Sequence, residues 1–129
     1  MANIATYQEE KWLQETFKDV VTYCGLLDDS AIDAEGEGGT LTNEITTYTG
    51  NRPAITFGAI TDVGGKATIK NSAALEFLVM PAVTVAYAIV CDAATAGNIL
   101  YWAPLAANKI CNAGDTFNIA IDALVLDLA

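Results

Sequence analysis

Hydrophobic and polar residues alternate with a period of two along most of the chain after residue 40, and this period predicts β-strands. The clearest run is residues 83–89, where Val83, Val85, Tyr87 and Ile89 share one face. The other face of this run carries only threonine and alanine, without a charge. A strand with no charged face is typical of the centre of a sheet that is covered on both sides. We therefore expect residues 83–89 to form a central strand.

Shorter runs of the same kind predict further strands, separated by clusters of glycine, asparagine, aspartate and proline. The other strands are expected at residues 20–27, 45–48, 54–60, 68–70, 75–79, 99–102, 117–121 and 124–128. Pro104 is expected to end the strand at 99–102 or to place it at a sheet edge. The apolar positions change from odd to even near Asp122, which predicts a bulge or break there. In the turn at 92–98, Asp92 is expected to close an Asx-type turn and Gly97-Asn98 to adopt left-handed conformations.

Residues 6–21 show a helical period instead. The letters TYQE match a capping box, with Thr6 as N-cap and Glu9 at the third helical position. The apolar residues of this segment fall within half of a helical wheel: Trp12, Leu13, Phe17, Val20 and Val21. This amphipathic helix either packs on its own domain, the favoured reading, or serves as an arm on a neighbouring subunit. In sum, we expect a single domain over residues 1–129 with a mainly β fold. It would be an antiparallel β-sandwich of jelly-roll or immunoglobulin-like type with one N-terminal amphipathic helix.

Composition limits the kinds of partner that we expect. Six basic residues against 16 acidic ones give a net charge of −10, which disfavours nucleic acid as a partner. No apolar run approaches the length of a membrane span and the N-terminus shows no secretion signal, so neither a membrane nor export is expected.

The chain has three cysteines, Cys24, Cys91 and Cys111. Because their number is odd and they form no CxxC pair, buried thiols are favoured over a disulfide framework or a zinc site.

The chain lacks the side chains that most catalysis needs. It contains no histidine, and EGEGG at 35–39 is followed by no phosphate-binding motif, so we expect neither an enzyme nor a cofactor. Glu76 and Asp122 are carboxylates at outward strand positions rather than a hydrolytic pair. An aromatic platform for sugars from Tyr48, Tyr87, Tyr101 or Trp102 is conceivable, but core packing is the favoured role for most of them.

The acidic, glycine-rich segment 28–39 is expected to be a solvated loop. Its carboxylates are potential calcium ligands: Asp28, Asp29, Asp33, Glu35 and Glu37. Their spacing does not match an EF-hand loop, so a metal site is the less favoured reading.

Several segments together resemble a widespread family of small tailed-phage and prophage proteins, usually labelled tail fibre or minor structural protein. The resembling letters are AITFGA at Ala54–Ala59, DAATAGNILYWAPL at Asp92–Leu105, Lys109, and NAGDT at Asn112–Thr116. VTYCGLL at 21–27 stands where that family has its first strand, so the resemblance covers about residues 20–129. Pro104 stands where the family usually has glycine, and the helix and the segment NSAALEFLVMPAVTVAYA are only loosely similar.

The resemblance implies a structural protein of the virion, made in the bacterial cytoplasm. Of the roles open to such proteins, we expect a capsid cement or decoration protein that binds the major capsid protein. Self-association as a dimer or trimer is expected as well. The alternative is a tail or tail-fibre component that binds a receptor or glycan. The helix and the loop at 28–39 are the expected contact segments.

Overall fold

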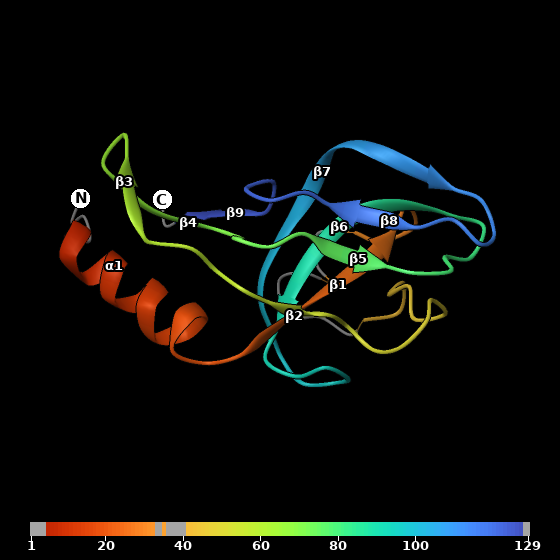
Figure 1. Cartoon of the computed structure of the whole chain (residues 1–129), viewed down its shortest axis with the longest axis horizontal. Helices are drawn as coiled ribbons and strands as arrows, with labels where there is room; N and C mark the ends of the chain where they lie inside the picture. Colours follow the sequence, from red (N-terminus) through yellow and green to blue (C-terminus); the bar gives the residue numbers. More distant parts are fainter. Residues whose placement is uncertain (1–4, 33–34, 36–40, 128–129) are drawn as a thin grey trace. The chain divides into compact units, whose positions relative to one another are not determined.

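The computed structural model describes residues 5–32, 35 and 41–127 (Figure 1). The chain divides into two compact units, each with its own internal packing. The helical unit comprises Met1–Val21, Ile55–Ala74 and Ile119–Ala129, and the sandwich unit comprises Thr22–Ala54 and Leu75–Asn118. The fold is mainly β with antiparallel sheets packed as a sandwich, as the alternation predicts. That both units act as one domain stays a prediction.

A four-stranded sheet of order β2-β1-β6-β7 and a two-stranded sheet β5-β8 form the sandwich unit (Figure 1). The strands of the larger sheet are β1 (Thr22–Asp28), β2 (Ala54–Ile55), β6 (Val83–Cys91) and β7 (Ile99–Cys111). Those of the smaller sheet are β5 (Leu75–Phe77) and β8 (Phe117–Ile119). Aromatic rings fill the core beside the smaller sheet: Phe77 packs edge-on against Tyr48 at 5.0 Å and lies 6.0 Å from Phe117.

Strand β6 is the central strand that the sequence predicts. It pairs antiparallel with β1 on one side and with β7 on the other. Val85, Ile89 and Cys91 are fully buried on one face, and Ala88 and Val90 are buried on the other. A strand that is buried on both faces has no use for charged side chains, which explains its composition.

Strand β7 is the edge of the larger sheet, and Pro104 lies within it rather than at its end. Its register with β6 is interrupted, because Tyr87 pairs with Pro104 while Val85 pairs with Lys109. One β6 residue therefore faces four β7 residues, 105–108, across a wide bulge. The prediction that proline marks an edge is confirmed.

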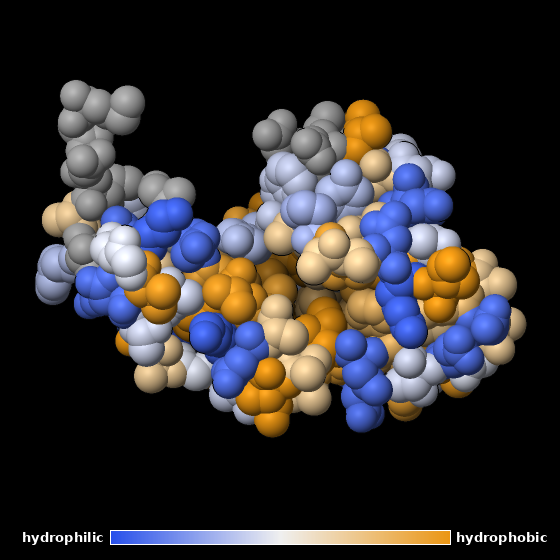
Figure 2. Space-filling model, turned by 90° about the horizontal axis from the view of Figure 1, so that it is seen from above, coloured by the Kyte–Doolittle hydropathy of each residue, from blue (hydrophilic) through white to orange (hydrophobic). Residues whose placement is uncertain are grey.

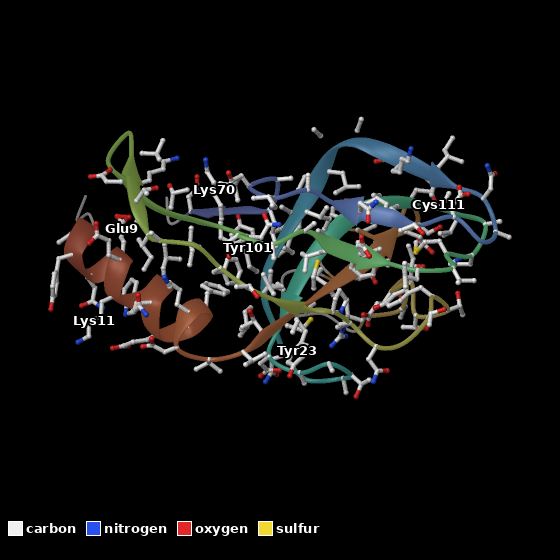
Figure 3. The ribbon with its side chains drawn as sticks, in the orientation of Figure 1. Glu9, Lys11, Tyr23, Lys70, Tyr101 and Cys111 are labelled. Atoms are coloured by element: carbon white, nitrogen blue, oxygen red, sulfur yellow. The ribbon has the colours of Figure 1, made fainter. Side chains whose placement is uncertain are left out.

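The helical unit consists of α1 (Thr6–Leu13), a π-helical turn (Gln14–Lys18) and a sheet of order β3-β4-β9. Its strands are β3 (Thr61–Val63), β4 (Lys66–Lys70) and β9 (Val125–Asp127). Helix α1 packs on β4. Glu9, Leu13 and Phe17 are buried at four-residue intervals along α1 and the π-helical turn. Figure 3 shows Glu9 on the side of the helix toward β3 and β4, and Lys11 on the opposite side.

The predicted capping box is wrong. The N-cap residue is Ala5, and no side-chain hydrogen bond caps the helix. Glu9 instead accepts a hydrogen bond from the backbone N–H of Ala67 on β4, at 3.2 Å. The carboxylate thus satisfies a buried strand donor, and a local capping motif cannot compete with that tertiary contact.

The predicted break near Asp122 is confirmed, and a buried asparagine holds it. Asp122 has a positive φ of 65°, and residues 121–123 form a turn before β9. Asn71, fully buried, donates from Nδ2 to the carbonyls of Ala73 and Ala120 and accepts the Leu124 N–H at Oδ1, each at 2.9 Å. These bonds fix the reversal that shifts the apolar phase by one residue.

Some expected strands are shorter or missing. Residues 45–48 form no strand; the neighbouring Glu44 makes only an isolated bridge to Leu27. The strand expected at 54–60 is confined to β2, and the one at 75–79 ends at Phe77 because Val79 has a positive φ of 54°. In the turn after β6, Ala96 and Gly97 have positive φ, rather than Gly97 and Asn98.

Candidate functional site

Carboxylates and thiols are the first candidate groups for a site. Glu76 is exposed on β5, as expected for an outward strand position. Asp122 is exposed too, but it lies in the turn at 121–123 and not in a strand. Within residues 5–32, 35 and 41–127, no cluster of three or more His, Cys, Asp or Glu residues is placed to hold a metal ion. Burial raises the pKa of Cys24 to about 12 and that of Cys91 to about 11. These thiols and Cys111 are buried and free, so they serve as small apolar core residues.

In the acidic segment, Glu35 anchors the backbone. Its carboxylate accepts hydrogen bonds from the N–H groups of Ile32 (3.2 Å), Thr42 (3.0 Å) and Asn43 (3.1 Å). The Asn43 side-chain amide donates a fourth bond, at 2.8 Å. The carboxylate is therefore committed to holding the two ends of the loop together. Of the other calcium candidates, Asp28 and Asp29 lie at the end of β1 and in the following turn, and Asp33 and Glu37 lie outside the described residues.

Acid is expected to release this clamp. The hydrogen bond from the Asn43 side chain, with the backbone N–H bonds, holds the pKa of Glu35 below its ordinary value of about 4.3. A lowered folded-state pKa means that the clamp contributes stability above the ordinary pKa and loses it as the pH falls through the lowered one. The amide resonances of Thr42 and Asn43, followed by NMR from about pH 7 to about pH 2, should titrate with a midpoint below the ordinary value.

The matched control for this titration is Glu35→Gln, which keeps the size of the side chain but cannot titrate. In that variant the two amide resonances should show no such step. A midpoint at or above about 4.3 in the natural protein would contradict the clamp.

Arg52, the single arginine of the chain, ties two loops of the sandwich unit together. Its guanidinium binds the Glu44 carboxylate with two bonds of 2.7 Å, from Nε and Nη2. Nη1 donates to the carbonyls of Ala93 (3.0 Å) and Ala96 (2.7 Å) in the turn that follows β6. The carboxylate in turn packs over Gly25, where a Cβ would come within 2.9 Å of it. This buried ion pair fixes the end of the sandwich where the two loops meet.

Asp92 closes the same turn, as predicted. Its Oδ1 accepts the Asn98 N–H at 2.7 Å, and its Oδ2 accepts the Asn98 side-chain amide at 2.9 Å. These bonds lower the pKa of Asp92. A small pocket of about 100 Å³ lies between the two loops, lined by Glu44, Tyr48, Arg52 and neighbours. Pockets for small molecules are several times larger, so this one suits water or a single side chain.

The four aromatic candidates form no exposed platform. Tyr48 is buried against Phe77, and burial raises its pKa to about 12. Tyr87 and Trp102 pack together at 6.0 Å over a core cluster of the larger sheet, and both are only partly exposed, as is Tyr101. Core packing therefore accounts for these rings. On the face that Figure 2 displays, hydrophobic residues are interleaved with hydrophilic ones.

The outer face of the helix is exposed to solvent. It borders a shallow groove of about 570 Å³ whose other wall is Ala59 and Ile60. The helix side of the groove is lined by Tyr7, Glu10, Lys11, Gln14, Glu15, Lys18 and Asp19. Tyr7 is 74% exposed there. The expectation that Trp12, Val20 and Val21 share the buried face is wrong, because all three are exposed.

Comparison with known protein families decides the identity. The family described as Podophage GP4 fiber I protein gp80 matches residues 3–127, nearly the whole chain. The chain belongs to this gp80 family. The match includes the helix, so the helix is part of the family's pattern and not an addition to it. No curated protein matches the chain.

Membership in the gp80 family makes the chain a structural protein of a tailed phage and confirms the resemblance seen in the sequence. Among the described residues, no helix is long and apolar enough to span a lipid bilayer. Sequence reasoning missed the Arg52–Glu44 pair, although a single arginine in so acidic a chain was a usable signal.

Proposed function

We propose that this gp80-family protein is a fibre or tail component of the phage particle, and that it acts by protein contact rather than by catalysis. The family description, which names a fiber protein, supports the fibre over the capsid. Action by protein contact is supported by the way in which side-chain hydrogen bonds hold the loops in place. The charged groups Glu35, Glu44, Arg52 and Asp92 are all engaged in holding loops of the sandwich unit.

A rigid subunit of this kind suits repeated assembly. When many copies bind to a symmetric structure, weak individual contacts add through multivalency. Each contact then needs only about 1,000 Å² of buried surface to be specific. We propose other virion proteins and further copies of this chain as the partners, with neither nucleic acid nor a membrane involved. The net charge of −10 supports the exclusion of nucleic acid.

Capsid decoration predicts a different copy number, which makes the two roles separable. A capsid lattice offers on the order of hundreds of equivalent sites, whereas a tail or its fibres offer a few to tens. Quantitative mass spectrometry of purified particles, with the major capsid protein as the internal standard, should find the lower range. Hundreds of copies would assign the protein to the capsid instead, and absence from particles would overturn both roles.

Deleting residues 1–18 is not a clean test of the helix in assembly. Leu13 and Phe17 belong to the core of the helical unit, where Phe17 packs against Phe57 at 5.7 Å. Their removal would take two buried side chains out of that core. Point variants on the outer face of the helix keep this core intact and are preferable.

A further inference from the structure

The outer face of the helix has a charge pattern that complements itself. Glu10, Gln14 and Lys18 line the groove at four-residue intervals, with an acid at one end, a neutral amide in the middle and a base at the other end. Turning this pattern by 180° about Gln14 places each charge opposite its counterion. Such a pattern is what an isologous contact between two identical subunits requires.

We propose that two copies of this chain pair through this groove, with their helices antiparallel about a two-fold axis near Gln14. Glu10 of each copy then faces Lys18 of the other, which gives two symmetric ion pairs. A parallel arrangement in register would place lysine against lysine and glutamate against glutamate, so charge selects the antiparallel one.

The N-terminal end of the same face carries an exposed aromatic side chain. Tyr7 precedes Gln14 by seven residues and also lines the groove. It is 74% exposed. Antiparallel pairing brings Tyr7 of each copy against the other copy and removes it from water. Buried apolar area is the main source of affinity in such contacts, while the ion pairs set the register.

The charge of the whole chain also favours this surface. Two molecules of charge −10 repel each other, and the repulsion is smallest where the facing surfaces are nearly neutral. The groove is lined by three acidic and two basic residues, a net charge of −1. Lys11 and Glu15, whose Nζ and Oε1 lie 4.0 Å apart, already neutralise each other within one helix.

This pairing specifies how the further copies named among the proposed partners would bind, and it does not depend on where the protein sits in the particle. It is tested on the purified full chain by sedimentation equilibrium, whereas the proposed function is tested on particles. Either can therefore fail alone.

The experiment exchanges the two charges singly and together. Glu10→Lys places lysine against lysine twice in the dimer, and Lys18→Glu places glutamate against glutamate twice. Each single variant should weaken dimerisation by about tenfold or more. The double variant E10K/K18E restores opposite charges with their sides exchanged, and it should recover dimerisation to within about threefold of the natural protein.

Matched controls carry the same change of charge elsewhere. Glu76→Lys matches the first variant and Lys66→Glu the second, and both side chains are exposed and lie outside the groove. Neither should alter dimerisation by more than about twofold at moderate salt. Circular dichroism verifies that every variant is folded. A natural protein that stays monomeric up to millimolar concentration, a double variant no better than the singles, or controls as weak as the singles would each overturn the pairing.

Discussion

Replacing Phe77 with alanine should lower the free energy of unfolding by about 3–5 kcal/mol, the largest loss expected from a single apolar side chain. Phe77 is fully buried and lies between the rings of Tyr48 and Phe117. Its removal takes away the transfer free energy of a large side chain, leaves a cavity and breaks two aromatic contacts. Urea unfolding, with near-ultraviolet circular dichroism of the tyrosines as the probe, measures the loss.

The neighbouring Leu78 supplies the control, because it is among the exposed large hydrophobic residues. Leu78→Ala should cost no more than about 0.5 kcal/mol. A loss below about 1 kcal/mol for Phe77→Ala would show that the ring is not central to the core.

Arg52→Ala should cost a similar amount, about 3–5 kcal/mol, for an electrostatic reason. The variant leaves the carboxylate of Glu44, mostly buried, without its counterion. It also removes the donor that the Ala93 and Ala96 carbonyls share. A buried charge without its partner costs more than the pair itself contributes, so the loss should exceed that of an ordinary surface ion pair. Urea unfolding of the variant measures it.

The double variant R52A/E44Q separates the two causes. Neutralising Glu44 removes the uncompensated charge, so the double variant should be more stable than Arg52→Ala alone. Lys109→Ala removes an exposed cation and should be nearly neutral. If Arg52→Ala were as mild as Lys109→Ala, the ion pair would not hold the loops.

The alternation of side chains was enough to predict where the sheets are buried. Residues 83–89 carry no charge on either face, and the structure buries both faces of β6. The change of phase near Asp122 likewise located a real reversal. Both predictions succeed because the pleat of a strand forces successive side chains to opposite faces, whatever the tertiary context.

The sequence did not predict features that depend on contacts between residues far apart in the chain. Glu9 looked like a capping residue because its partner on β4, Ala67, is far away in sequence. Residues 45–48 resembled a strand, but Glu44 and Tyr48 are held by Arg52 and Phe77 and not by a continuous ladder. Local propensity cannot anticipate such contacts, and it yields to them when they are buried.

The sequence predicted the outer face of the helix only in part. The sequence identified the helix as amphipathic, and Leu13 and Phe17 indeed pack inward. It assigned Val20 and Val21 to the same buried face because it extended an α-helical period beyond the point where the helix ends. The backbone makes a π-helical turn at Gln14–Lys18 and then leaves the helix, and no periodicity reveals that change in advance.

The long edge strand β7 affects how molecules of this protein associate at high concentration. Pro104 offers no N–H, residues 105–108 bulge out of register, and Lys109 adds a charge. A second strand laid along this edge would meet one missing donor, an uneven outline and a charged side chain. We therefore expect concentrated protein to resist stacking of its sheets into fibrils, even though β7 is an edge strand of thirteen residues.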